Sequence, residues 1–173
     1  MSDLKSRLLK NSTLDTTSVL ESSDVFKDKL IDTGIPMLNV ACSGRLDGGI
    51  GKGVLMLAAP SKMFKTGFTL LMAAAFQRSD PEAIVLFYDS EFGAPLAYFE
   101  KFGVDTERVI HTPITDIEQL KHDLVSQLNE LTIKDKVMIV IDSIGNLASK
   151  KEIDDAMDGK VVVDMTRAKA FKS

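Results

Sequence analysis

Residues 54–66 read V-L-M-L-A-A-P-S-K-M-F-K-T, and the rest of the chain is interpreted outward from this stretch. Residues 54–59 form an apolar run of strand length, which a short turn-prone loop connects to Lys65, Thr66 and an apolar helical stretch. Strand, loop, Lys-Ser/Thr and helix is the order of a nucleotide-binding P-loop, in which backbone N–H groups hold phosphates. The usual pattern has glycine at two positions, where this chain carries Ala59 and Phe64. The motif therefore needs support from the rest of the chain.

The composition is that of an ordinary globular protein. The 173 residues suffice for one domain with a sizeable core, and hydrophobic and charged residues make up 45% and 27% of them. No apolar run approaches a membrane span, the first ten residues do not resemble a signal peptide, and the one cysteine excludes an internal disulfide. We expect a cytoplasmic protein without a membrane partner. Because the net charge is −4, nucleic-acid binding would require a local basic surface.

Apolar runs alternate with helical stretches along the chain. The expected strands are residues 54–59, 84–88, 108–111 and 137–141. The expected helices are residues 66–77, 95–102, a helix that starts at the capping box 115–118, and residues 152–172. Uninterrupted apolar runs are typical of strands that are buried on both faces of a parallel sheet. This order predicts an α/β fold with a mostly parallel sheet covered by helices.

The segments before residue 54 are less regular. Residues 3–10 are expected to form a short helix, and the Ser/Thr-rich residues 12–23 a connector. Such an arm is often a subunit contact, although a frayed end explains it equally well. Residues 33–53 contain six glycines, which predicts a loop with tight backbone turns after a short helix at Pro36; a plain connector is the alternative.

Polar residues recur at the carboxyl ends of the expected strands, where parallel sheets bind their ligands. Lys65 and Thr66 follow the first strand, Asp89 and Glu91 the second, and Asp142 the fourth. Lys65 would contact the β- and γ-phosphates, Thr66 would offer its hydroxyl to Mg²⁺, and backbone N–H groups would cradle the phosphates. Asp142 would bind Mg²⁺ through water or accept a hydrogen bond from Thr66. Glu91 could orient or deprotonate an attacking water. Singly, each has a plainer explanation as a solvated or turn-forming side chain.

Other candidate residues are less specific. Tyr98 could stack on a base or pack within the protein. His111 and His122 have no ligand partners at metal-binding spacing and are expected to be structural. Residues 149–173 carry six basic and five acidic groups, so a solvated mixed-charge face explains them as well as a DNA contact does. The basic residues that could contact DNA phosphates are Lys150, Lys151, Lys160 and Arg167.

Five blocks, taken in order, resemble a known family. They are T-G-I-P-M-L-N-V-A (33–41), A-P-S-K-M-F-K-T (59–66), F-Y-D-S-E-F-G (87–93), G-V-D-T-E-R-V-I-H (103–111) and I-D-S-I-G-N-L-A-S-K-K-E (141–152). Together they resemble the bacteriophage UvsX-like recombinases of the RecA family of DNA strand-exchange ATPases, over essentially the whole chain. The phage proteins resemble this chain in carrying Phe just before the P-loop lysine.

The resemblance implies a partial RecA-like P-loop ATPase core over residues 33–173. Residues 1–32 would be an arm and linker that contacts the adjacent subunit of a filament. Lys65 and Glu91 look like the catalytic P-loop lysine and the water-activating glutamate, Thr66 and Asp142 like the magnesium-binding pair, and Tyr98 like the tyrosine that packs on adenine. The segment after Leu147 looks like the first DNA-binding loop. The phosphate cradle would consist of Ala59, Pro60, Ser61, Lys62, Met63, Phe64, Lys65 and Thr66.

The function implied is that of an ATP- and Mg²⁺-dependent DNA recombinase. It would form homo-oligomeric filaments on single-stranded DNA, hydrolyse ATP in a DNA-dependent reaction, and exchange strands with double-stranded DNA in recombination, repair and recombination-dependent replication. Single-strand-binding and loader proteins would be further partners, in the cytoplasm of the host cell. The alternatives are another RecA-fold ATPase such as a hexameric helicase, or an inactive truncated fragment that caps filaments.

Family members continue past Ser173, so we expect a core truncated on its C-terminal side. The family implies the strand order third, second, fourth, first, which would leave the P-loop strand as an open edge that invites wrong pairing. We expect the fragment by itself to bind nucleotide weakly and not to exchange DNA strands.

Overall fold

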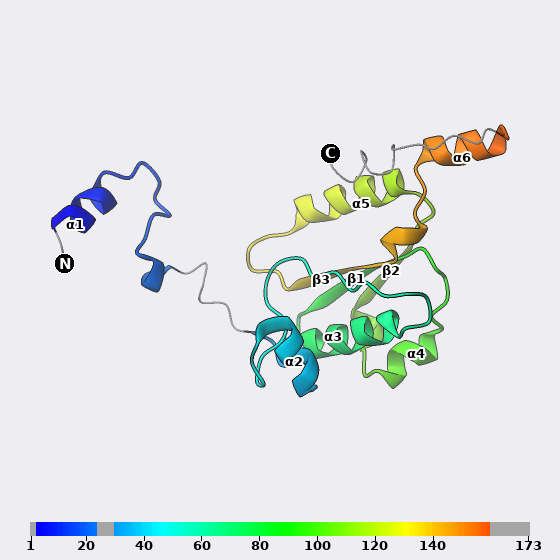
Figure 1. Ribbon diagram of the computed structural model, residues 1–173, viewed down its shortest axis with the longest axis horizontal. Coiled ribbons are helices and arrows are strands. Elements are labelled where there is room, and N and C mark those ends of the chain that lie inside the picture. Colours follow the sequence, from blue (N-terminus) through cyan, green and yellow to red (C-terminus); the bar gives the residue numbers. More distant parts are fainter. Residues whose placement is uncertain (1–2, 24–29, 160–173) are drawn as a thin grey trace.

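The computed structural model describes residues 3–23 and 30–159. Its sheet consists of β1 (Ile84–Asp89), β2 (Val109–Pro113) and β3 (Val137–Asp142), all parallel, in the order β2-β1-β3 (Figure 1). The parallel α/β fold predicted from the sequence is therefore confirmed. The strand order also matches the expected order third, second, fourth.

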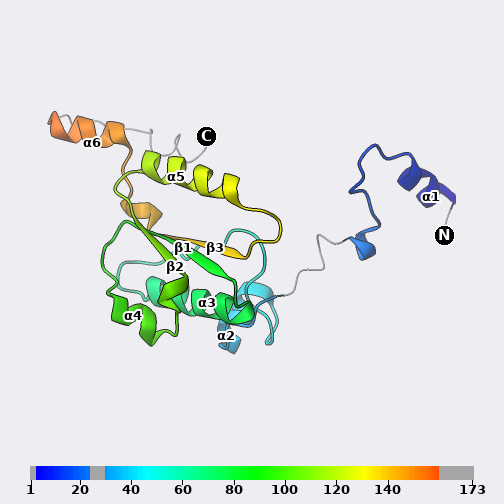
Figure 2. The ribbon, with the colours of Figure 1, turned by 180° about the vertical axis from the view of Figure 1, so that it is seen from behind.

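Helices cover both faces of the sheet. The helices α3 (Lys65–Ser79) and α4 (Leu96–Lys101) lie against one face, and α5 (Ile117–Glu130) lies against the other, as the front and back views show (Figures 1 and 2). Alternate residues of β1 serve the two layers, since Val85 and Phe87 pack in the α3 cluster whereas Leu86 and Tyr88 pack in the α5 cluster. The central strand is thus buried on both faces, as its uninterrupted apolar sequence predicts.

The predicted strand over residues 54–59 is wrong. No strand is present there in the described structure, and Val54, Leu55 and Met56 are 101%, 53% and 80% exposed. A strand is stabilised by the hydrogen bonds of a neighbouring strand and by packing on its faces. This run has neither in the described residues, because β3 pairs only with β1 there. An apolar run indicates that a segment can be buried, but it does not supply the partner.

The start of α5 differs by one residue from the predicted capping box. Asp116, not Thr115, is the N-cap, and its carboxylate accepts a hydrogen bond from the backbone N–H of Gln119 at 2.8 Å. Both side chains are good caps, so spacing alone does not choose between them. The first half of α5 packs on the core through Ile117 and Leu120, which are buried, whereas Leu128 is 47% exposed.

The short helices predicted before residue 54 are present. The helix α1 (Asp3–Lys10) buries no residue and is followed by a 3₁₀ turn (Leu20–Ser22). As predicted, α2 (Pro36–Ser43) begins at Pro36, and it ends before Gly44, whose φ is 74°. Short 3₁₀ turns also span Thr106–Arg108 and Ile144–Asn146.

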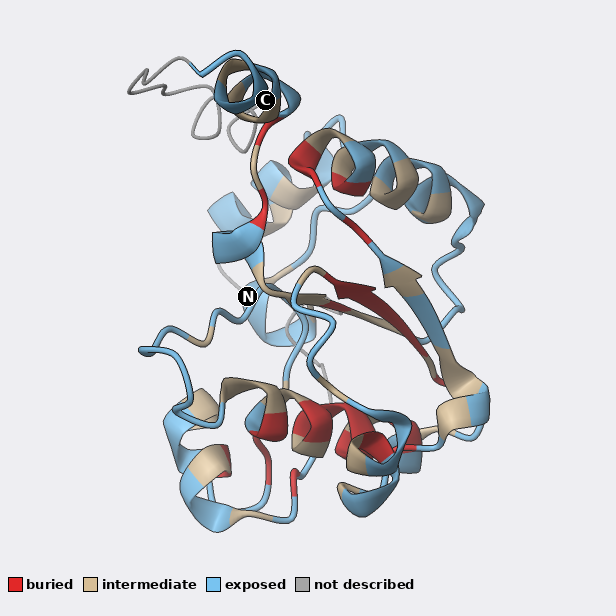
Figure 3. Ribbon diagram, turned by 90° about the vertical axis from the view of Figure 1, so that its right-hand side faces the viewer, coloured by how far each residue is buried: buried red, intermediate tan, exposed pale blue. Residues whose placement is uncertain are grey.

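The last helix described is α6 (Lys150–Met157), which Ser149 and Glu152 cap at its N-terminus. The sequence predicted a longer helix over residues 152–172, and the part of it from residue 160 onward lies outside the described residues. Burial is concentrated in α3 and the sheet, whereas α6 is largely exposed (Figure 3). None of the described helices is both long and apolar enough to span a membrane.

Candidate functional site

The carboxyl ends of β1 and β3 lie level with each other. Asp89 is the register partner of Asp142, so two carboxylates end neighbouring strands side by side. Just beyond them, Ser90 joins the two strands, because its N–H donates to the carbonyl of Asp142 and its hydroxyl donates to the carbonyl of Ser143, both at 2.8 Å. The sequence prediction that polar groups gather at this edge of the sheet is confirmed.

The phosphate-loop candidate reaches this edge through α3. Thr66, the second residue of α3, donates its hydroxyl proton to Asp142 Oδ2 at 2.6 Å. This contact spans 76 positions of sequence and joins the start of α3 to the end of β3. One of the two arrangements predicted for Asp142, a direct bond with Thr66, is therefore present.

The two loop positions where the usual motif has glycine differ in backbone conformation. Phe64 has φ 63°, the left-handed conformation that glycine adopts most easily. The backbone at this position therefore has the conformation for which the usual motif supplies glycine. Ala59 is not among the residues with positive φ, and alanine therefore fits there without backbone strain. Lys62 is a second non-glycine residue in the left-handed region, with φ 66°.

Aromatic contacts hold Phe64 in this conformation. Its ring packs edge-on against Phe68, and tilted against Phe102 of the α4 turn, with ring centroids 5.6 Å apart in each pair. A Cβ atom at Gly67 would lie 2.5 Å from the Phe64 ring, so the absence of a side chain at Gly67 makes room for it. Gly67 was not singled out from the sequence. The signal was available as a glycine one helical turn after a bulky residue.

The helix α3 presents unsatisfied backbone donors to the loop. It begins at Lys65, and its N-cap Phe64 makes no side-chain cap. N–H groups at the start of a helix, together with the helix dipole, form an anion-binding position. The Lys65 ammonium lies back over the loop and donates to the Pro60 carbonyl at 3.2 Å.

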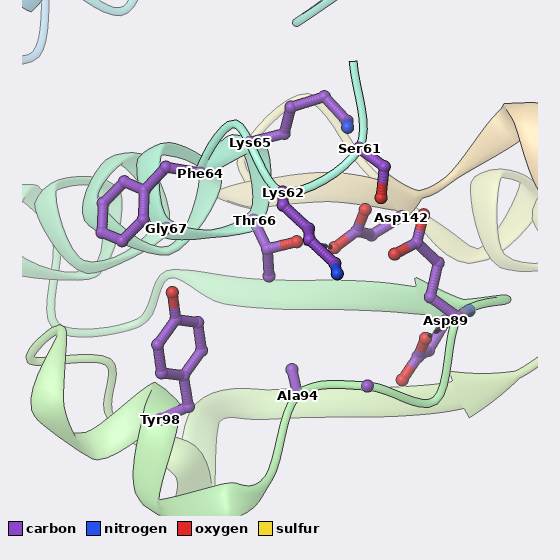
Figure 4. Close-up of a pocket in the computed structure, with 12 residues that line it drawn as sticks. Ser61, Lys62, Phe64, Lys65, Thr66, Gly67, Asp89, Ala94, Tyr98 and Asp142 are labelled. Atoms are coloured by element: carbon purple, nitrogen blue, oxygen red, sulfur yellow. Dashed lines mark hydrogen bonds between the residues drawn. The ribbon is translucent and has the colours of Figure 1, made fainter. Parts of the chain in front are cut away.

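These elements enclose a cavity of about 330 Å³ (Figure 4). Its lining includes most of the residues predicted for a nucleotide site, and leaves out Ala59, Pro60 and Met63. Gly93 and Ala94 also line it and were not predicted. The predicted residues that the fold brings together here are Ser61, Lys62, Phe64, Lys65, Thr66, Glu91, Tyr98 and Asp142.

Three carboxylates line one side of the cavity, those of Asp89, Glu91 and Asp142. Burial raises the pKa of Asp142 above its usual value, and the negative charges of Glu91 and Asp89 add to this effect, while the Thr66 hydrogen bond and Lys65 oppose it. Three carboxylates around one cavity favour a cation. Among the described residues, no group of three or more His, Cys, Asp or Glu side chains has the geometry to hold a metal ion by itself. A cation here would therefore need oxygen ligands from the substrate or from water.

The segment after β1 is ordered by Asp89. The Asp89 Oδ1 atom accepts the backbone N–H groups of Glu91 at 2.9 Å and of Phe92 at 2.8 Å, and His111 lies 3.1 Å from the other oxygen. Glu91 in turn accepts a hydrogen bond from the Ser143 hydroxyl at 2.9 Å. His111 thus has a structural contact, as expected of it. The contact of Ser143 with Glu91 was not predicted from the sequence.

Tyr98 lies on the opposite wall of the cavity from the acids. It is half-buried in α4, and its ring packs edge-on against Phe102 with centroids 4.8 Å apart. Figure 4 shows the ring below the start of α3. Packing within the protein is thus present, and the cavity-facing position keeps the base-stacking prediction open.

The predicted DNA-contacting residues are not part of this cavity. Lys150 and Lys151 are exposed in the first turn of α6, at whose start the Lys150 N–H donates to the Glu118 carboxylate at 3.1 Å. Lys160 and Arg167 lie outside the described residues.

Comparison with known proteins agrees with this architecture. A family described as the RecA N-terminal domain matches residues 10–171. The chain is 54% identical over 174 residues to the "Recombination and repair protein" of Enterobacteria phage T4, a match that covers 100% of this chain and 44% of the phage protein. It is also 32% identical over 140 residues to "Protein RecA" of Helicobacter hepaticus, with 80% of this chain and 38% of that protein covered. The chain thus spans less than half the length of these relatives.

Proposed function

This chain belongs to the RecA N-terminal domain family, and from this premise we propose that it binds ATP in the cavity between the phosphate loop and the ends of β1 and β3. The observation that carries the proposal is the 2.6 Å hydrogen bond between Thr66 and Asp142. It lies at the N-terminus of α3, whose first N–H groups have no side-chain cap. A cavity of about 330 Å³ is at the lower end of the size range of small-ligand pockets. It therefore suits the phosphate end of a nucleotide.

The phosphate tail would lie against the start of α3. The N–H groups there would donate to phosphate oxygens, and Lys65 would leave the Pro60 carbonyl to neutralise their charge. The Lys65 bond to a neutral carbonyl is a weaker interaction than an ammonium–phosphate pair, so this exchange favours nucleotide binding.

Mg²⁺ fits the donors that the site offers. Thr66 and Asp142 present hydroxyl and carboxylate oxygens, the ligands that Mg²⁺ prefers, and the ion commonly completes its shell with phosphates and water. These two residues would hold the ion, which when bound supplies positive charge to the phosphate oxygens. Burial raises the pKa of Asp142, and the negative charges of Glu91 and Asp89 add to this effect; a bound cation would oppose both.

Glu91 would position the attacking water for ATP hydrolysis. Its Oε1 atom is held by the Ser143 hydroxyl, and its backbone N–H by Asp89. A carboxylate fixed in this way can accept a proton from water and orient it toward the terminal phosphate. Tyr98 would lie against the adenine, since a half-buried aromatic wall at the edge of the cavity offers a stacking face.

At the scale of the assembly, we propose the activity of a DNA recombinase. Residues 1–32 would be the arm that contacts a neighbouring subunit, and residues 33–173 part of the ATPase core. Such proteins would form filaments on single-stranded DNA in the cytoplasm, pair it with double-stranded DNA, and use loader and single-strand-binding proteins. The relatives' printed names, "Recombination and repair protein" and "Protein RecA", support this proposal. Lys150 and Lys151, together with Lys160 and Arg167, would contact DNA phosphates.

The test is ATP binding and hydrolysis by the purified chain, with and without single-stranded DNA. We expect Lys65→Ala to weaken ATP binding at least about tenfold, because it removes a charge-assisted contact with phosphate. Glu91→Gln should leave binding nearly unchanged but lower any hydrolysis about 10²-fold or more. Equal ATP affinity in wild type and Lys65→Ala would contradict the proposed site. Electron microscopy separates filaments from closed rings, and rings would point to a helicase-like protein instead.

A further inference from the structure

A second lysine of the phosphate loop faces the cavity. Lys62 lies three residues before Lys65 and lines the cavity wall. Figure 4 shows its side chain pointing into the pocket on the side of Thr66, whereas Lys65 runs the other way, toward Pro60. The usual P-loop pattern has no required residue at position 62. The motif therefore assigns no role to this side chain.

The backbone of the loop explains the direction of Lys62. With φ 66°, it adopts a left-handed conformation that residues with a side chain rarely take. The next residue, Met63, is 60% exposed and does not line the cavity. Lys62 is exposed as well, but its side chain lines the cavity, whereas that of Met63 does not. An exposed ammonium at the edge of this cavity can form a charge-assisted hydrogen bond with a negatively charged ligand.

The charges around the cavity favour a phosphate-binding role for Lys62. Asp89, Glu91 and Asp142 provide three carboxylates, against which the lining has two ammonium groups, on Lys62 and Lys65. A triphosphate beside three carboxylates is repelled unless cations lie between them. Lys62 makes no hydrogen bond or ion pair with any residue that the structure describes, so its ammonium is available to a ligand.

We propose that Lys62 is a second phosphate-binding residue, whose ammonium contacts the triphosphate tail of the nucleotide on the side of the Thr66–Asp142 pair. This role rests on the proposed function and extends it. Lys65 and Lys62 would hold the tail from two directions. A loop that carries Phe64 and Ala59 in place of the two usual glycines would thereby gain a charge that the motif does not require.

The test measures ATP and AMP binding by isothermal titration calorimetry in the presence of Mg²⁺. Lys62→Met should weaken ATP binding about tenfold or more but change AMP binding less than about threefold, because AMP lacks the β- and γ-phosphates. Lys62→Arg should keep ATP affinity within about threefold of wild type, since it keeps the charge. Lys62→Gly removes the same charge while suiting the left-handed backbone, so a distorted loop cannot account for its loss of affinity.

The matched control is Lys134→Met. Lys134 is exposed in the segment between α5 and β3, and its replacement changes the net charge equally. It should leave ATP affinity unchanged. If Lys62→Met and Lys62→Gly bind ATP as wild type does while Lys65→Ala loses binding, the role of Lys62 is overturned and the proposed function stands. If wild type fails to bind ATP, or Lys65→Ala binds it equally well, both are overturned.

Discussion

Phe64 shows how a residue that breaks a sequence motif can keep its geometry. Its backbone adopts the left-handed conformation expected of the missing glycine, at a cost of about 1–2 kcal/mol for a residue with a side chain. The ring contacts with Phe68 and Phe102 offset this cost, since each aromatic pair contributes about 0.5–1.5 kcal/mol. They are possible because Gly67 leaves space beneath the ring.

We predict that the effect of Gly67→Ala changes sign with the residue at position 64. In wild type, the new methyl group displaces the Phe64 ring from its aromatic contacts, and the free energy of unfolding should fall by about 1 kcal/mol. In a Phe64→Ala background no ring is displaced, and alanine in a helix should raise it by about 0.5–1 kcal/mol. Urea unfolding of the four proteins of this double-mutant cycle measures the coupling. Additive effects would show that the two residues are independent.

At the scale of elements, α3 positions the site, and hydrogen bonds anchor it at both ends. Its first turn is joined to β3 through Thr66 and Asp142. Its last turns are joined to the chain before β2, where the buried Gln77 side chain donates to the Asp105 and Arg108 carbonyls. The Arg108 guanidinium donates in return to the carbonyl of Gln77 at 3.2 Å and to that of Asp80 at 3.1 Å. A cation at this end also complements the helix dipole.

We predict that Arg108→Met lowers the free energy of unfolding by about 2 kcal/mol. The substitution leaves several carbonyls at the end of α3 without their donor and removes the ion pair with Asp105, whose atoms are 2.8 Å apart. Arg108→Lys should recover only part of the loss, because a single ammonium cannot reach all these oxygens. Chemical denaturation followed by circular dichroism compares the three proteins. Full stability of Arg108→Met would contradict the role assigned to this cluster.

At the scale of the whole molecule, the described core has a sheet of three strands and an apolar segment that is not paired with it. Residues 54–56 are largely exposed, although their sequence is that of a buried strand. One edge of β3 has no paired strand among the described residues. An unpaired edge and an exposed apolar segment both favour association between chains.

We predict that Val54→Lys reduces self-association without destabilising the fold. Val54 is 101% exposed, so a charge there should change the free energy of unfolding by less than about 0.5 kcal/mol. Sedimentation velocity at rising concentration should show less oligomer than for wild type. As a control, Val85→Lys places the same charge in the core, where Val85 is 1% exposed, and should unfold the protein. A large loss of stability in Val54→Lys would instead mean that the segment is packed in solution.

The sequence by itself determined the α/β class, the three parallel strands, the position of α3 and the end of the sheet where the polar residues gather. These follow from burial patterns within short segments and from the rule that parallel strands need helical crossovers. The tertiary structure alone decided that residues 54–59 pair with no strand among the described residues, that Gly67 makes room for Phe64, that Lys62 lines the cavity, and that Ser143 holds Glu91. The physical reason is that each of these outcomes depends on a partner brought near by folding, or on a backbone conformation that local sequence does not specify. A pattern of apolar residues contains neither.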